Sequence, residues 1–272
     1  MVRVGCPSHN CGGRCLLRVH LKDGVIARIE TDDRPGDTVS DPQLRACIRG
    51  RSYRHRQYHK DRLRYPLKRV GERGSGDFER ISWDEATDMM AENIQRIREQ
   101  YGNTSIYIPY GTGSYNQTNG KWPADRLMHM YGGALGYYNS YSWACITRAT
   151  ATVYGTDVCG NQRQDWLNSQ FIIMWGWNPS EMRDGTNSEY FLKEARKKGA
   201  RIICIDPRMT MSAVALADEW IAIRPGTDVA LMSAMAWVMI TEDLYDKDFV
   251  DKYCMGFDRS QMPEAYRNEE SY

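Results

Sequence analysis

The first sixty residues alternate short apolar stretches with turns and charged residues, which predicts a small unit of strands and loops. Strands are expected at residues 14–20 and 25–31, and Lys22-Asp23-Gly24 between them is typical of a hairpin turn. Such a unit contains few apolar residues for a core of its own. We therefore expect it to gain stability from a bound metal centre.

Two helices and a buried strand are predicted in the next part of the chain. Ser82 and Glu85 form a capping box in front of apolar residues at helical spacing, and this helix should end at Gly102. Residues 104–109 are an apolar run that predicts a buried strand, and a second helix is expected at about 124–131.

From about residue 170 onward, strands and helices alternate. Strands are expected at 171–175, 201–205 and 220–223, with a helix at 187–198 and a long apolar helix after the third strand. Continuous apolar runs are typical of strands buried on both faces, and a helix between two of them predicts a right-handed parallel unit. The predicted class is α/β: a small β-rich N-terminal domain followed by Rossmann-like, three-layer α/β material.

Composition excludes several classes of protein. Of the 272 residues, 42% are hydrophobic and 11% aromatic, which is enough for a packed core and argues against a disordered chain. The formal net charge is +1, so no overall field favours nucleic acid or an anionic membrane. The first residues show neither an apolar export segment nor a twin-arginine signal, and no apolar run could span a bilayer. We therefore expect a soluble chain.

Positive charge is concentrated in residues 45–73, called the basic belt below, which carry eleven Lys or Arg and two acidic residues. The net charge of the belt is +9, which leaves −8 for the rest of the chain. A segment of this kind binds phosphates or an acidic partner, or forms a solvated surface, and its composition alone does not choose between these.

Four of the eight cysteines lie in the first fifth of the chain, namely Cys6, Cys11, Cys15 and Cys47. Clustered thiols in a chain that can form its own core point to metal ligation more than to disulfides. Three close cysteines and a distant one fit a [4Fe-4S] cluster better than zinc, whose structural sites pair two short Cys-x2–4-Cys motifs. Zinc, disulfides and free thiols remain alternatives at this point.

Glycine and polar residues follow each predicted parallel strand. The three sequences are Trp175-Gly-Trp-Asn-Pro, Asp206-Pro-Arg and Arg224-Pro-Gly-Thr-Asp. Ligands of such sheets bind where the strands end, so these sequences should line one crevice. Glycine permits close approach of the backbone, and Asp or Asn can hydrogen-bond a purine or a ribose. Because neither a glycine-rich dinucleotide fingerprint nor a phosphate loop is present, the residues predict only a nucleotide-like ligand.

Taken in order, these motifs resemble those of the molybdopterin oxidoreductases of the dimethyl sulfoxide reductase family, in particular the catalytic subunits of its membrane-associated members. The resemblance rests on Cys6-Pro-Ser-His-Asn-Cys-Gly-Gly-Arg-Cys, Cys47-Ile-Arg-Gly-Arg, Phe78-Glu-Arg-Ile-Ser-Trp-Asp-Glu-Ala and the three strand-end sequences. It covers residues 6–231.

The resemblance implies two cofactors, a [4Fe-4S] cluster and molybdenum, or tungsten, held by two molybdopterin guanine dinucleotides and one protein side chain. Ser142, which follows Tyr141, occupies the position of that protein ligand. Without the resemblance, Ser142 would be interpreted as a turn or cap serine. Cys145 is the competing candidate, and we expect it instead to be a small core residue. A serine ligand is typical of the sulfoxide and N-oxide reductases of the family.

The resemblance also implies roles for residues around the cofactors. Arg49 takes the place of a Lys or Arg that lies between the cluster and one pterin, the alternative being one more arginine of the basic belt. Tyr115 and Trp122 are expected on the substrate side. The expected contacts to the guanine dinucleotides are Trp175, Gly176, Asn178, Glu181, Asp206, Arg208, Pro225, Gly226 and Asp228.

The implied activity is removal of an oxygen atom from an S-oxide or N-oxide, with electrons delivered through the [4Fe-4S] cluster. The alternatives are oxyanion reduction, dehydrogenation of a small substrate, or a truncated, non-catalytic electron-transfer protein. The implied partners are a small-molecule oxide, a ferredoxin-like multi-cluster subunit and a membrane anchor subunit, and no nucleic acid.

We expect residues 1–62 to bind the cluster and residues 63–272 to form an incomplete dinucleotide-binding α/β region. Family members are much longer and add further α/β material and a C-terminal barrel-like domain, so we expect an N-terminal fragment that is inactive alone. The resemblance further implies export by the twin-arginine route and attachment to the membrane through partner subunits.

Overall fold

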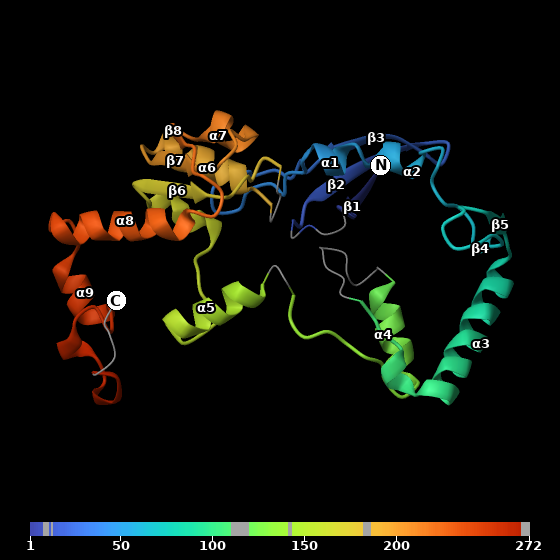
Figure 1. Ribbon diagram of the computed structural model, residues 1–272. Helices are drawn as coiled ribbons and strands as arrows, with labels where there is room; N and C mark the ends of the chain where they lie inside the picture. Colours follow the sequence, from blue (N-terminus) through green and yellow to red (C-terminus); the bar gives the residue numbers. More distant parts are fainter. Residues whose placement is uncertain (8–10, 12, 110–119, 141–142, 182–185, 268–272) are drawn as a thin grey trace.

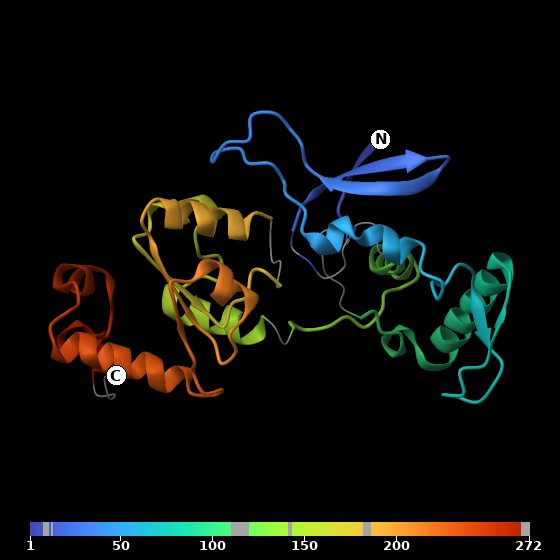
Figure 2. The same ribbon diagram turned by 90° about the horizontal axis from the view of Figure 1, so that it is seen from above.

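The helices and strands form three groups that lie side by side without one common core (Figure 1). The computed structural model describes residues 1–7, 11, 13–109, 120–140, 143–181 and 186–267. An N-terminal antiparallel sheet comes first, then a hairpin with long helices, and then a parallel sheet with its own helices. The N-terminal antiparallel sheet and the parallel sheet are also separate when the molecule is seen from above (Figure 2). The class is α/β, as predicted.

The N-terminal sheet has three antiparallel strands in the order β1-β2-β3. They are β1 (Val2–Gly5), β2 (Leu16–Lys22) and β3 (Val25–Thr31). Leu17, Val19 and Ile29 alternate with polar residues and form the buried face. Asp23 and Gly24 both have positive φ angles, 51° and 78°, as a tight hairpin turn requires. The predicted hairpin is confirmed, and β1 is a third strand that we did not predict.

Two short helices close this small core. They are α1 (Ile48–Arg51) and α2 (Tyr53–Gln57). Cys47 is the N-cap residue of α1 and has extended backbone angles. Ala46 and Tyr53 pack against the buried residues of the sheet. Gly50 is buried beside Cys6 and Leu17. The helices therefore bring Cys47 back to the strand that ends just before Cys6.

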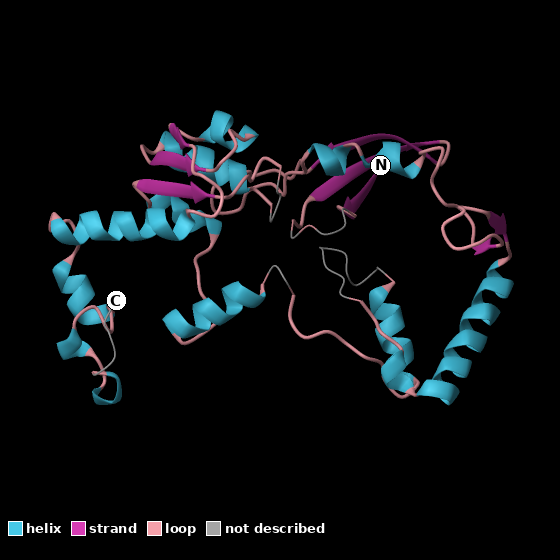
Figure 3. Ribbon diagram, in the orientation of Figure 1, coloured by secondary structure: helices cyan, strands magenta, loops and turns pink. Residues whose placement is uncertain are grey.

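The middle of the chain forms a hairpin and three long helices (Figure 3). The elements are β4 (Leu67–Arg69), β5 (Phe78–Arg80), α3 (Trp83–Tyr101), η1 (Asn103–Ser105), α4 (Lys121–Met130) and α5 (Ala144–Tyr154). The Ser82 hydroxyl accepts a hydrogen bond from the Glu85 backbone N–H at 3.0 Å, which is half of the predicted capping box. The Glu85 carboxylate approaches Lys68 at 3.4 Å instead of completing the box. Both predicted helices are confirmed.

Our prediction of a buried strand at residues 104–109 is wrong. Part of it belongs to η1, and Tyr107 makes a single isolated bridge to Leu135. Tyr107 and Leu135 are each about half exposed. An apolar run becomes a buried strand only when neighbouring strands cover it, and within the described residues this run meets only the segment around Leu135.

The C-terminal half contains a parallel sheet in the order β6-β7-β8. Its elements are η3 (Arg163–Asn168), β6 (Phe171–Trp175), α6 (Ser188–Lys197), β7 (Arg201–Ile205), α7 (Met211–Leu216) and β8 (Glu219–Ile221). Trp175 lies opposite Ile205, and Ile205 lies opposite Ile221, so the three strands end at the same edge. The predicted strands and the helix between the first two are confirmed.

The core of this half lies between the sheet and its helices. Its buried residues are Met174, Leu192, Ile202, Cys204, Ala213 and Leu216. They come from β6, α6, β7 and α7, so each of these elements contributes apolar side chains to one core. This core holds the strand ends in fixed register beneath the residues that follow them.

Two helices follow the parallel sheet and extend beyond it (Figure 1). They are α8 (Asp228–Thr241) and α9 (Lys247–Tyr253), followed by the short turns η4 (Arg259–Gln261) and η5 (Glu264–Tyr266). Helix α8 is the long apolar helix that we predicted. None of its side chains is buried against the described residues. In the described part of the chain, no helix combines the length and apolar content that crossing a bilayer requires.

Candidate cofactor-binding site

Four cysteines converge at the end of the N-terminal sheet. Cys6 follows β1, and its backbone N–H donates to the Cys15 carbonyl at 2.9 Å. The Gly13 N–H lies 3.4 Å from the Cys11 sulfur. Cys6, Cys11, Cys15 and Cys47 are all half-buried, and no disulfide joins any cysteine of the described chain. Disulfide bonds therefore do not occupy these four thiols.

Three of the four thiols lie close enough to influence one another electrostatically. Burial raises the pKa of the Cys15 thiol, and the nearby Cys47 and Cys11 thiols raise it further, so three of the four groups influence one another. Among the described residues, no three His, Cys, Asp or Glu side chains are placed to hold a single metal ion. Four cysteine thiolates are the donors that a [4Fe-4S] cluster requires.

Gly50 allows the sulfur of Cys6 to approach α1. A Cβ atom at this position would lie 2.9 Å from the Cys6 sulfur, closer than real Cβ contacts allow. The backbone of α1 therefore lies directly against one cluster ligand. This close approach, together with the four thiols, supports the assignment of a cluster here.

A buried carboxylate, Asp32, holds the loop that carries Cys47. Its Oδ2 atom accepts hydrogen bonds from the Leu44 N–H at 2.8 Å and from the Arg34 Nε at 2.7 Å. Burial alone would raise the pKa of Asp32, but these hydrogen bonds and the charge of Arg34 outweigh burial and lower it. We did not predict this role, because an isolated Asp after a strand carries no signal for it.

The second part of the site lies at the carboxyl edge of the parallel sheet. Gly176 follows β6 with a φ angle of 57°, and nothing lies within 4 Å of the place where its Cβ would be. Asn178 is buried, and its Oδ1 accepts from the Ser212 hydroxyl at 2.6 Å. That hydroxyl in turn accepts from the Ser180 N–H. Asn178 thus fixes the turn that presents Ser180 and Glu181.

The sequences after β7 and β8 meet this turn. Asp206 Oδ1 accepts from the Arg208 N–H at 2.9 Å, and the guanidinium of Arg208 lies 3.4 Å from the Glu181 carboxylate. The Trp175 indole donates to Asp228 Oδ1 at 2.8 Å, which joins the end of β6 to the start of α8. The predicted dinucleotide contacts from all three strands are therefore close together.

The remaining glycine-containing sequence forms an exposed turn before α8. Pro225 and Gly226 are both exposed, and Gly226 has a φ angle of 80° with open space around its Cα atom. A side chain is disfavoured at such a φ angle. The exposed backbone of this turn is accessible to a ligand at the sheet edge.

Contacts from the segment after β6 connect the two parts of the site. The Arg49 guanidinium on α1 donates to the Glu181 carbonyl at 3.3 Å. The Asn187 side-chain amide donates to the Gln43 carbonyl at 2.9 Å, and Arg45 lies over the Tyr190 ring at 4.3 Å. Glu181 therefore touches both Arg49 of the cluster unit and Arg208 of the sheet edge.

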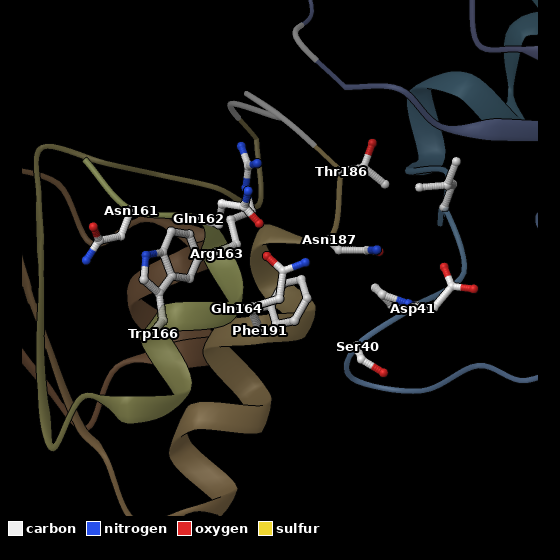
Figure 4. A pocket seen from close by; sticks show the side chains of 12 residues that line it. Ser40, Asp41, Asn161, Gln162, Arg163, Gln164, Trp166, Thr186, Asn187 and Phe191 are labelled. Atoms are coloured by element: carbon white, nitrogen blue, oxygen red, sulfur yellow. The ribbon is translucent and has the colours of Figure 1, made fainter. Parts of the chain in front are cut away.

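A pocket opens beside these contacts, between the loop before Cys47 and the N-terminus of α6 (Figure 4). Its volume is about 620 Å³, and Asp41, Arg163, Trp166 and Asn187 are among the residues that line it. The Oδ1 atom of Asn187 is buried and has no hydrogen-bond partner. The two units thus meet across a partly polar gap.

The remaining predicted residues have different outcomes. Ser142 and Tyr115 lie outside the described residues. Trp122 lies on α4, which is separate from the parallel sheet in both views (Figures 1 and 2). Cys145 is exposed on α5, so our expectation of a small core residue is wrong.

Comparison with known proteins adds two family matches. The family model described as the molybdopterin oxidoreductase Fe4S4 domain matches residues 2–59, and the molybdopterin oxidoreductase model matches residues 62–268. These matches support the [4Fe-4S] cluster and the molybdopterin cofactor, and they exclude the alternative of zinc.

Individual relatives agree with the family matches. The chain is 49% identical over 263 residues to dimethyl sulfoxide reductase DmsA of Escherichia coli, covering 93% of this chain and 32% of that protein. It is 46% identical to DmsA of Haemophilus influenzae, over 93% of this chain and 33% of that protein. The chain thus spans about a third of the length of these relatives.

A solved structure also matches. Acetylene hydratase from Pelobacter acetylenicus superimposes with a TM-score of 0.64 at 30% identity, over 92% of this chain and 34% of that one. The cysteine quartet, the strand-end residues and the family matches lead to one conclusion. The chain belongs to the molybdopterin oxidoreductase family.

Proposed function

We propose that this chain supplies the cluster-binding unit and part of the dinucleotide-binding region of an enzyme that removes oxygen from S-oxides or N-oxides. The observation that carries the proposal is the contact from Arg49, two residues after the fourth cysteine, to Glu181 at the sheet edge. The names of the relatives, dimethyl sulfoxide reductases, support the substrate class. We assign residues 1–62 to the cluster and 63–272 to the dinucleotides.

Each group of residues has a role in this proposal. When bound, the molybdenum cofactor would supply a centre that takes up the oxygen atom and gives two electrons to the substrate, and the cluster would return these electrons one at a time. The four cysteines hold the cluster, and the cation of Arg49 favours its more negative, reduced state. Asp206, Arg208, Gly226 and Asp228 hold the dinucleotides at the sheet edge.

The residues nearest the substrate are assigned by resemblance. Ser142 is the proposed protein ligand of the metal, and its oxygen suits a metal in a high oxidation state. Tyr115 and Trp122 are proposed to face the substrate. These three residues precede α5 and the parallel sheet in the chain.

Electrons must reach the cluster from another protein. We propose a ferredoxin-like subunit with several clusters, itself bound to a membrane anchor. The basic belt, which includes exposed Arg51 and Arg54 on α1 and α2, gives this side of the cluster unit a positive charge that suits an acidic partner.

The test uses anaerobically purified holoenzyme with dimethyl sulfoxide, an N-oxide and an oxyanion as substrates. Arg49→Met should keep its iron and molybdenum but lose at least tenfold in oxide turnover with electrons entering through the cluster, and Arg49→Lys should retain most of it. Ser142→Ala should lose turnover altogether while the visible absorbance of the cluster stays unchanged.

Three results would contradict the proposal. Full oxide turnover in Ser142→Ala would exclude it as the ligand. An enzyme that reduces the oxyanion but neither oxide would belong to another activity of the family. Iron without molybdenum in the purified enzyme would indicate an electron-transfer protein.

A further inference from the structure

The side chain of Thr186 contacts a cluster ligand that lies far from it in the sequence. Its hydroxyl lies 3.5 Å from the sulfur of Cys15, although the two residues are 171 positions apart. The same oxygen accepts a hydrogen bond from the Arg14 backbone N–H at 2.7 Å. Thr186 stands just before α6, on the segment that follows β6.

The ligand state of Cys15 determines the direction of its hydrogen bond with Thr186. A threonine hydroxyl has one proton to donate and lone pairs to accept with. Since the Arg14 N–H donates to the Thr186 oxygen, the hydroxyl proton can point toward sulfur. A cysteine that ligates iron is a thiolate and can only accept. The Thr186 O–H is therefore the donor to the Cys15 sulfur.

Cys15 differs in this respect from Cys11. The Cys11 sulfur is near the backbone N–H of Gly13, which belongs to the same loop and is present whatever the side chains are. Cys15 has a backbone hydrogen bond from Cys47 and, in addition, a side-chain donor from a distant part of the sequence. One substitution removes this side-chain donor, together with the acceptor of the Arg14 N–H, without changing the residues of the cluster loop.

Neighbouring contacts hold Thr186 in position. Asn187 donates to the Gln43 carbonyl at 2.9 Å, so the residue after Thr186 is fixed to the loop that leads to Cys47. Figure 4 shows Thr186 and Asn187 facing that loop across the pocket. The hydroxyl is thus held against the cluster unit rather than free to rotate away from it.

We propose that Thr186 is a positioning residue that tunes the [4Fe-4S] cluster by donating its hydroxyl hydrogen bond to the sulfur of Cys15. This inference rests on the proposed function, because it requires the cluster. A hydrogen bond to a cluster sulfur stabilises the reduced, more negative state and raises the reduction potential. The cluster potential thereby depends on the segment that also carries the dinucleotide contact Glu181.

The experiment measures the cluster in anaerobic holoenzyme by redox titration with electron paramagnetic resonance, and by resonance Raman spectroscopy in H2O and D2O. Thr186→Val should shift the midpoint potential to a more negative value and reduce the D2O shift of one iron–sulfur stretching band, to which the backbone hydrogen bond from Cys47 still contributes. Thr186→Ser keeps the hydroxyl and should restore both. The matched control is Thr31→Val, which removes a hydroxyl contact to the Ala46 N–H in the same unit but none to sulfur. It should leave both readouts at wild-type values.

The inference fails if Thr186→Val, with a full complement of iron, keeps the wild-type potential and the wild-type size of the D2O shift. It also fails if Thr186→Ser shifts as far as Thr186→Val, or if Thr31→Val shifts equally, because either result would reflect loop displacement. In all these cases oxide turnover by the wild-type enzyme would still support the proposed function. Absence of iron from the wild-type protein would instead contradict the proposed function itself.

Discussion

At Gly50 the absence of a side chain lets α1 lie against the sulfur of Cys6. An added Cβ would lie 2.9 Å from that sulfur. The backbone of Cys6 is held in place because its N–H donates a hydrogen bond to the Cys15 carbonyl. The sulfur cannot move away without leaving its place in the quartet. A single methyl group at this position therefore acts on the cluster rather than on helix stability, which alanine would increase.

We expect Gly50→Ala to lower the iron content of anaerobically purified protein by at least half. The control is Gly120→Ala, at a position with a helical φ angle of −62° and nothing within 4 Å of the added Cβ. Iron per chain and the visible absorbance of the cluster measure the result. Equal iron contents in Gly50→Ala and Gly120→Ala would show that the close approach does not limit cluster binding.

Single residues differ in how well the sequence predicts them. The four cysteines could be predicted because three lie within ten positions of one another and their chemistry is specific. Glu181 and Thr186 could be placed beside the cluster unit only by the tertiary structure, since no short-range pattern links them to Arg49 or Cys15. The contacts that join the cluster unit to the sheet edge link residues far apart in the sequence, whereas sequence motifs are local.

At the scale of elements, the conformation of the loop from Asp32 to Cys47 depends on the side chain of Asp32. The Asp32 carboxylate is buried and accepts hydrogen bonds from Arg34 and Leu44. Its pKa is lowered by these contacts against the effect of burial. A lowered pKa means that the folded state favours the charged form, so its stabilising contribution is present above the ordinary carboxyl pKa of about 3.9 and is lost as the pH falls through the lower pKa of the folded state.

We expect Asp32→Asn to lower the free energy of unfolding of the cluster unit by on the order of 2 kcal/mol at neutral pH. Loss of cluster absorbance on heating, measured between about pH 3 and pH 7, tests this. The wild-type protein should lose stability toward the acid end more steeply than Asp32→Asn, because the variant lacks the titrating group. Parallel pH profiles for the two proteins would show that Asp32 is not the group responsible.

Elements with a strong local signal were predicted well. Residues 171–175 and 201–205 are continuous apolar runs bounded by glycine and polar residues, and both are strands. The run at 104–109 has a similar composition but lacks strand neighbours among the described residues, so its prediction was wrong. Composition indicates that a segment can be buried, and pairing partners decide whether it forms a strand.

The whole molecule exposes an unusual amount of surface. Its accessible area is 20282 Å², whereas a compact protein of 31.4 kDa exposes about 12,000 Å². Much of the excess is apolar, because α3 and α8 have no side chain buried against the described residues. The sequence predicted α3 as a helix with apolar residues at helical spacing and α8 as an apolar helix, but it could not show what covers them.

We expect these 272 residues, purified alone, to bind a hydrophobic dye strongly and to self-associate. Replacing exposed apolar residues of α8 with Gln, for example Val229 and Trp237, should reduce both effects, and the same change at exposed Lys193 and Lys198 should not. Dye fluorescence and light scattering after size-exclusion chromatography are the measurements. A monodisperse monomer that does not bind the dye would contradict the expectation.

The distance along the chain between Cys15 and Thr186 also has a consequence for biosynthesis. A ribosome adds residues at about 5–20 per second, so the 171 positions between them take on the order of ten to thirty seconds to be made. Cys47 follows Cys15 by 32 positions, so for most of that time all four thiols are present while the segment that covers Cys15 does not yet exist. Iron can therefore reach the thiols during this part of translation, before the parallel sheet folds and its segment covers Cys15.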